Sequence, residues 1–151
     1  MGIFTQKRTP SHKAYAVVTG AGSGIGRSFA LELARRSGAV VCADINLAAA
    51  EETVAMIQNQ TGQQAYAVQC DVGDKDAVKT LSENAEQLLK HPVSLVINNA
   101  GVGLGGKFDD VTLDDWQWCM HVNLWGVIHG CHFFVPKFKK QGFGAIINVA
   151  S

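Results

Sequence analysis

The sequence predicts an α/β fold in which a doubly wound parallel sheet is covered by helices on both faces. Short apolar segments alternate with longer segments of helical periodicity along the 151 residues, in the order β-α-β-α-β-α-β-α-β. A glycine-rich turn follows the first apolar segment directly. Because crossovers between parallel strands are right-handed, we expect the five strands in the order 3-2-1-4-5.

The first strand and the first helix meet at the run Thr-Gly-Ala-Gly-Ser-Gly-Ile-Gly, residues 19–26. Residues 14–19 are typical of a strand buried on both faces, and apolar residues recur at i, i+4 and i+8 from Ile25, so a helix is expected to begin near Gly24. A helix N-terminus offers unpaired N–H groups to an anion, and glycine lets a pyrophosphate approach the backbone. The turn therefore predicts a nucleotide cofactor; a flexible Gly/Ser turn without a ligand is the alternative.

The second strand, residues 39–43, ends at Asp44, which lies 18 residues after the last glycine of the run. An acidic side chain in this place can accept hydrogen bonds from the adenosine ribose hydroxyls. It favours NAD over NADP, because a 2′-phosphate would meet a carboxylate. The nearest cation, Arg27, lies further along the first helix. Alternatively, Asp44 caps the helix that begins at Leu47.

The third and fourth strands also run into polar residues. Residues 65–69 lead to Asp71, which is either a ligand contact or an ordinary turn residue. Asp74, and not Asp71, is the expected cap of the following helix. Residues 93–97 form an apolar strand that leads to Asn-Asn-Ala-Gly, residues 98–101. On its own, this second sequence is typical of an ordinary turn that ends a strand.

A long helix is predicted to follow, with Thr112 and Asp115 as a capping pair at its start. Its aromatic residues, Trp118 among them, are expected to pack between helices, and Pro136 is expected to kink or end it. The glycine-rich loop 101–110 before this helix either borders a substrate pocket or is a flexible linker.

Five motifs resemble those of the short-chain dehydrogenase/reductase family, and they occur in the family's order. They are T-G-x-x-x-G-x-G at residues 19–26, the acidic end of the second strand, the Asp-Val pair after the third, N-N-A-G at 98–101, and the helical N-L-W-G at 123–126 followed by N-V-A-S at 148–151. Together they cover nearly the whole chain. The resemblance implies a Rossmann-type fold and hydride transfer between a nicotinamide cofactor and an alcohol or carbonyl substrate.

The resemblance also implies roles for individual residues. Ser151 aligns with the family's catalytic serine, and Asn123 aligns with the helix asparagine that holds a structural water in the proton relay. The implied NAD contacts are Gly20, Ser23, Gly24, Ile25, Gly26, Asp44, Asp71, Val72, Asn98, Ala100 and Gly101. In relatives the asparagines of N-N-A-G also tie the central strands together.

The family's general acid, a tyrosine in a Y-x-x-x-K sequence, does not occur in these 151 residues. Tyr15 and Tyr66 each lie in a predicted strand and lack the lysine. We therefore expect an N-terminal part of such an enzyme, with an arm at 1–12 and an incomplete NAD(P)-binding domain at 13–151, truncated before the last helices and strands. This chain alone is expected to bind NAD weakly and not to turn over. A non-catalytic NAD-binding or regulatory module is the alternative.

The family's later segments cover the fifth strand and parts of both sheet faces. Without them we expect a well-formed core near the first three strands and an exposed apolar edge at the fourth and fifth. In relatives the long helix also helps to form a subunit interface, so the full-length protein is expected to be a homo-oligomer, a dimer or a tetramer.

Composition excludes several other classes of function. The 13 basic and 13 acidic residues cancel and no long basic run occurs, which argues against nucleic-acid binding. No signal peptide, myristoylation pattern or membrane-spanning segment is recognised, so no membrane partner and a cytoplasmic location are expected. Four cysteines without a C-x-x-C pair are typical of reduced thiols.

One rival hypothesis is a metal-binding or assembly helix, because five potential ligands crowd residues 119–132. They spread around the helix and form no recognised ligand pattern, so no metal is expected. The residues concerned are Cys119, His121, His129, Cys131 and His132.

Overall fold

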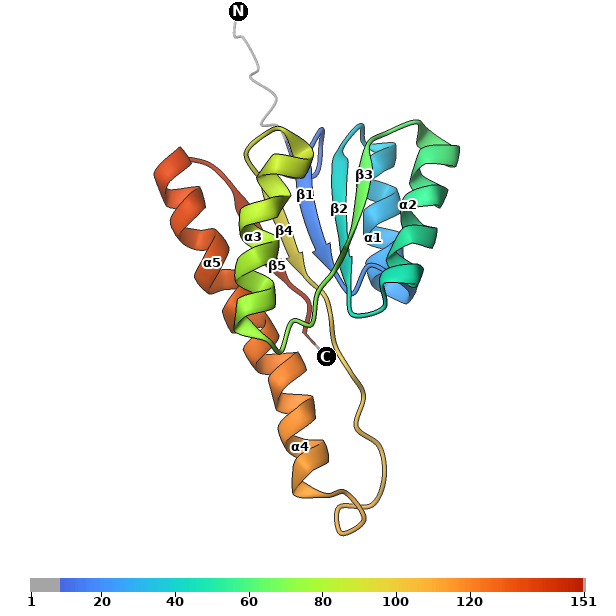
Figure 1. The fold of residues 1–151 in the computed structure, drawn as a ribbon, viewed down its shortest axis with the longest axis vertical. Coiled ribbons are helices and arrows are strands. Elements are labelled where there is room, and N and C mark those ends of the chain that lie inside the picture. The colour runs from blue at the N-terminus through green and yellow to red at the C-terminus, as the bar shows by residue number, and fades with distance from the viewer. Residues whose placement is uncertain (1–8, 151) are drawn as a thin grey trace, which may run out of the picture.

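The computed structural model describes residues 9–150, which form a parallel sheet in the order β3-β2-β1-β4-β5 (Figure 1). This order confirms the topology that the right-handed crossovers predict. The strands are β1 (Tyr15–Thr19), β2 (Ala39–Asp44), β3 (Ala65–Gln69), β4 (Leu95–Asn98) and β5 (Ala145–Asn148).

Helices cover both faces of the sheet (Figure 1). Helices α1 (Gly24–Arg35) and α2 (Leu47–Thr61) pack on one face, whereas α3 (Lys75–Leu89) and α5 (Gly126–Gln141) pack on the other. Successive strand residues point to opposite faces, so β1 contributes Ala16 and Val18 to the first core and Val17 to the second. All three are fully buried, which confirms the prediction of a strand buried on both faces.

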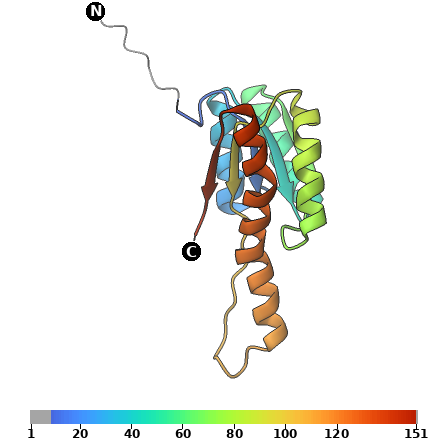
Figure 2. The same cartoon turned by 90° about the vertical axis from the view of Figure 1, so that its left-hand side faces the viewer.

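The predicted long helix consists of three parts. Helix α4 (Leu113–Met120) continues into the π-helical turn η1 (His121–Trp125) and then into α5. Figure 2 shows that α4 extends well beyond the sheet, and none of its residues is buried. The expectation that its aromatic residues pack between helices is therefore wrong for this part, because none of them is buried against another helix of residues 9–150.

Pro136 lies inside α5 and does not end it. The helix continues to Gln141 and ends at Gly142, whose φ of 80° gives the left-handed conformation common at helix C-termini. Proline removes only one helical hydrogen bond, the one to the carbonyl four residues earlier, and the packing of α5 on the sheet and α3 offsets that loss.

Most of the predicted caps are confirmed. Asp74 caps α3, and Thr112 and Asp115 form a reciprocal capping box at α4. Asp44 does not cap α2, because Asn46 occupies the N-cap position and accepts a hydrogen bond from the Ala49 amide at 3.1 Å. The carboxylate of Asp44 is consequently available for a different role.

The far edge of the sheet has the exposed apolar surface that the sequence predicts. The side of β5 away from β4 has no partner strand among residues 9–150, and Ile147 is 45% exposed. Between residues 9 and 150, no helix has both the length and the apolar character that crossing a membrane requires. All four cysteines are free thiols; Cys42 and Cys70 are buried, and burial raises the pKa of each to about 12.

Candidate functional site

The glycine turn between β1 and α1 rests on the end of β4. Gly20 and Gly24 have φ values of +65° and +52°, which favour glycine. A Cβ atom on Gly20 would lie 2.8 Å from the Cα of Ala100. A Cβ on Gly26 would collide with the Gly20 carbonyl. The close approach of these backbones fixes the N-terminus of α1 beside the end of the fourth strand.

The side chain of Thr19 locks the same two strand ends together. Its hydroxyl accepts hydrogen bonds from the backbone amides of Asn99 (3.0 Å) and Ala100 (3.1 Å) and donates to the Ile97 carbonyl (3.4 Å). In return, the Asn99 side chain donates to the Thr19 carbonyl at 3.0 Å. Neither Thr19 nor Asn99 was among the predicted site residues, although both belong to the recognised motifs.

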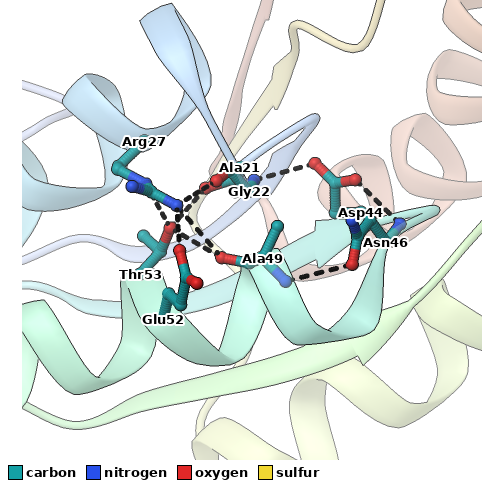
Figure 3. Close-up of polar contacts among 8 residues, drawn as sticks. All are labelled: Ala21, Gly22, Arg27, Asp44, Asn46, Ala49, Glu52 and Thr53. Atoms are coloured by element: carbon teal, nitrogen blue, oxygen red, sulfur yellow. Dashed lines mark hydrogen bonds and ion pairs between the residues drawn. The ribbon is translucent and has the colours of Figure 1, made fainter.

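Asp44 lies beside the turn at the carboxyl end of β2. Its Oδ2 accepts a hydrogen bond from the Gly22 amide at 2.8 Å, and its Oδ1 accepts one from the Asn46 amide at 2.9 Å (Figure 3). A Cβ on Gly22 would lie 2.8 Å from both this carboxylate and the Cβ of Ala49. The carboxylate is therefore held in a fixed orientation against the glycine turn.

A cavity of about 460 Å³ opens at the carboxyl ends of β1, β2 and β4. Ten of the predicted contacts line it, and they are Gly20, Ser23, Gly24, Ile25, Gly26, Asp44, Asp71, Val72, Ala100 and Gly101. Six further residues complete the lining, and these are Ile45, Cys70, Asn99, Val102, Trp118 and Val122. Asp44 and Asp71 are the charged residues of the lining, which contains no lysine or arginine among residues 9–150.

Asn98 is the one predicted cofactor contact that lies apart from the cavity. Its side chain is buried, 3% exposed, and its Nδ2 donates to the Asn148 Oδ1 at 2.8 Å. This bond joins β4 to β5, as the resemblance implied for the asparagines of this motif. A Cβ on Gly130 would collide with the amide of Asn98, so α5 approaches it closely.

Of the two predicted catalytic residues, Asn123 does not line the cavity, and Ser151 lies outside the residues that the structure describes. Asn123 is in the π-helical turn; its Oδ1 accepts from the Val102 amide at 2.8 Å, and its Nδ2 donates to the Val102 carbonyl at 2.9 Å. It thus fixes the glycine-rich segment that follows β4.

The segment after β3 closes the cavity on the side of α5. Asp71 forms a turn in which its Oδ1 accepts from the Gly73 amide at 2.9 Å, and the Val72 carbonyl accepts from Nδ1 of His129 at 2.9 Å. Burial, followed by the nearby charges of Asp71 and Asp74, raises the pKa of the Cys70 thiol to about 12. Cys70 is therefore a packing residue and not a nucleophile.

Trp118, which the sequence predicts to be a helix-packing residue, lines the cavity and is its largest lining side chain. It is 49% exposed and lies on α4, whose position over the cavity no local pattern specifies. The histidines and cysteines of residues 119–132 do not gather, and no group of three or more His, Cys, Asp or Glu within residues 9–150 is placed to hold a metal ion.

The turn and cavity fit a dinucleotide on three grounds. The first N–H groups of α1 have no intrahelical partner, and Ser23 makes no side-chain cap bond to them. A Cβ on Gly24 would meet nothing within 4 Å, so the backbone there is open to a ligand. The cavity lies where open α/β sheets bind their ligands. These features define a nucleotide-binding α/β domain of the Rossmann type.

The chain belongs to the short-chain dehydrogenase family, because the sequence model described as "short chain dehydrogenase" matches residues 14–151. This match covers all the described strands and helices.

Curated relatives match most of this chain. A probable oxidoreductase, EphD, from Mycobacterium tuberculosis is 40% identical over 136 residues, which are 89% of this chain and 22% of that protein. The 7alpha-hydroxysteroid dehydrogenase of Escherichia coli K12 is 35% identical over 90% of this chain and 52% of its own length. The chain thus spans between about a fifth and half of the length of these relatives.

Solved structures show the same fold. A short-chain dehydrogenase/reductase from Burkholderia phymatum in complex with NAD is 36% identical, with a TM-score of 0.89 over 95% of this chain and 50% of that one. An alcohol dehydrogenase from Thermococcus sibiricus complexed with 5-hydroxy-NADP is 26% identical, with a TM-score of 0.81 over 88% of this chain and 56% of that one.

Proposed function

We propose that these residues form the cofactor half of an NAD-dependent oxidoreductase, which passes hydride between nicotinamide and a small alcohol or carbonyl substrate. The observation that carries this proposal is the glycine turn at the N-terminus of α1 with Asp44 beside it, both in one cavity. The unpaired N–H groups of the turn bind the pyrophosphate, and Asp44 accepts hydrogen bonds from the adenosine ribose.

The preference for NAD over NADP rests on charge. The carboxylates of Asp44 and Asp71 line the cavity, and no cation among residues 9–150 lines it. A 2′-phosphate carries about −1.5 to −2 charges at neutral pH and would meet Asp44 without a counter-charge. The ribose hydroxyl of NAD, in contrast, can donate to a carboxylate oxygen.

The remaining residues orient the substrate side. Asn123 holds both polar groups of the Val102 backbone, so the segment after β4 keeps its shape next to the cavity. Ser151 polarises the substrate oxygen. A bound nicotinamide supplies or accepts the hydride. The proton transfer requires a tyrosine-lysine pair that these 151 residues do not contain, so this chain alone binds the cofactor and does not turn over.

Calorimetric titration of the 151-residue chain with NAD and with NADP tests the proposal. We expect saturable binding of NAD, weaker binding of NADP, and a loss of about tenfold or more in NAD affinity for Asp44→Ala, because a charge-assisted hydrogen bond contributes about 1.5–3 kcal/mol. Asp109→Ala is the matched control, since it removes an exposed carboxylate outside the cavity lining. A folded chain that binds neither dinucleotide would refute the proposal.

For the whole protein we propose a cytoplasmic homo-oligomer without nucleic-acid or membrane partners. Its support is the apolar surface along α4, η1 and α5, where Trp116, Trp125 and Ile128 are all substantially exposed. Light scattering of the full-length protein would test it. A monomer at all concentrations would contradict the oligomer.

A further inference from the structure

Arg27 is not among the residues that line the cofactor cavity, but it contacts the glycine turn that does. Figure 3 shows its side chain between the turn and helix α2. Its guanidinium donates to the Gly22 carbonyl, while the Gly22 amide donates to the Asp44 carboxylate at 2.8 Å. A positive and a negative side chain therefore hold the two polar groups of one glycine. Arg27 thus brings a positive charge into contact with the glycine turn.

The guanidinium of Arg27 also contacts two side chains of helix α2. Nε of Arg27 donates to Oγ1 of Thr53 at 3.0 Å, and an Nη atom lies 3.1 Å from the carboxylate of Glu52. Thr53 is fully buried, and its hydroxyl in turn donates a hydrogen bond to the Ala21 carbonyl at 2.8 Å, which fixes the position of its oxygen. The side chain of Arg27 is only 25% exposed, whereas that of Glu52 is 71% exposed.

The contacts divide into two kinds. Thr53 and the backbone carbonyls are neutral and fix where the guanidinium lies, whereas Glu52 is its one ion-pair partner among residues 9–150. Removing the carboxylate of Glu52 would leave Arg27 bonded to Thr53 and the backbone carbonyls, with its positive charge no longer paired. The presence of Glu52 therefore determines how much the positive charge of Arg27 offsets the negative charge of Asp44.

We propose that Glu52 is a specificity-determining residue, which excludes the 2′-phosphate of NADP by neutralising Arg27 behind the glycine turn. The inference rests on the proposed dinucleotide function. It assigns part of the NAD preference to an ion pair outside the cavity lining. The pair has no direct contact with the ribose, so it acts through the electrostatic field and depends on ionic strength.

Fluorescence titration of the 151-residue chain with NADH and NADPH tests this proposal, because the two ligands differ only in the 2′-phosphate. Glu52→Gln is expected to raise the affinity for NADPH relative to NADH by about three- to tenfold at low salt, and the gain is expected to shrink as salt is added. Glu51→Gln is the matched control: it removes the same charge from the neighbouring exposed position of α2, which forms no ion pair within residues 9–150.

The double variant Arg27→Gln/Glu52→Gln completes the test, with folding checked by circular dichroism. The proposal expects the gain of Glu52→Gln to disappear when Arg27 is removed. Equal ratios for Glu52→Gln and Glu51→Gln, or a gain that persists without Arg27, would overturn it. If the folded wild-type chain binds NADH but the ratio does not move, only this inference fails. If it binds neither ligand, the proposed function fails as well.

Discussion

Thr19 and Asn99 hold the ends of β1 and β4 together through a reciprocal pair of hydrogen bonds. The Thr19 hydroxyl accepts from the Asn99 amide, and the Asn99 side chain donates to the Thr19 carbonyl, both at 3.0 Å. The glycine turn begins one residue after Thr19, so this pair holds the turn beside the end of β4, and residues of both segments line the cavity.

Replacing Thr19 with valine is expected to destabilise the chain by about 1–3 kcal/mol, because the partly buried amides of Asn99 and Ala100 lose their acceptor. Thr19→Ser keeps the hydroxyl and is expected to lose much less. Urea unfolding of the two variants would measure the difference. Equal losses would mean that the methyl group of Thr19, and not its hydroxyl, supports the turn.

Gly26→Ala is expected to prevent dinucleotide binding and to destabilise the fold, because the new Cβ would collide with the carbonyl of Gly20 and the amide of Asn99. Gly103→Ala is the control: its Cβ would meet nothing within 4 Å and its φ is not positive. Thermal unfolding and NAD titration would compare the two. A Gly26→Ala chain that binds as the wild type does would contradict the close packing of this turn.

Thiol reactivity is expected to divide the four cysteines into two pairs. Burial raises the pKa of Cys42 and of Cys70 to about 12, so neither forms a thiolate near pH 8, whereas Cys119 and Cys131 are partly exposed. Ellman's reagent is therefore expected to modify Cys119 and Cys131 in the folded chain and all four cysteines in guanidinium. Rapid modification of Cys42 in the folded state would show that the core between β2 and its helices opens.

The start of α4 is expected to loosen at low pH. Hydrogen bonds from the Thr112 side chain and backbone hold the pKa of Asp115 below its ordinary value of 3.8. A carboxyl group with a lowered folded-state pKa stabilises the helix above its ordinary pKa, and this contribution is lost as the pH falls through the lowered one. Helix content followed by circular dichroism through acid titration should show this loss. Asp115→Asn should remove that pH dependence, while Asp114→Asn, outside the capping box, should keep it.

Strand order and most helix caps could be predicted because they depend on local patterns. Right-handed crossovers leave few topologies for alternating strands and helices, and Asp74 carries the cap signal in its own residue type. The glycine turn was equally predictable, since only glycine allows the contact between Gly20 and Ala100.

Other features depend on contacts between distant segments. Asn98 and Asn99 are adjacent, yet the Asn98 side chain bonds to Asn148 of β5, whereas the Asn99 side chain bonds to Thr19 of β1. A sequence cannot tell which of the two lines the cavity without the position of the neighbouring strands. Trp118 likewise lines the cavity from α4, which is joined to α5 through the π-helical turn His121–Trp125, and the sequence does not specify where α4 lies relative to the sheet.

The most direct test of the account is an NMR titration of the chain with NAD, using ¹⁵N-labelled glycine so that its 16 glycines report on separate parts of the fold. We expect the amide signals of Gly20, Gly24 and Gly26 to shift saturably, while Gly62 and Gly142, at the far ends of α2 and α5, stay in place. Saturable shifts confined to glycines outside both the turn and the cavity lining, or no shifts in a folded sample, would contradict a dinucleotide site at this turn.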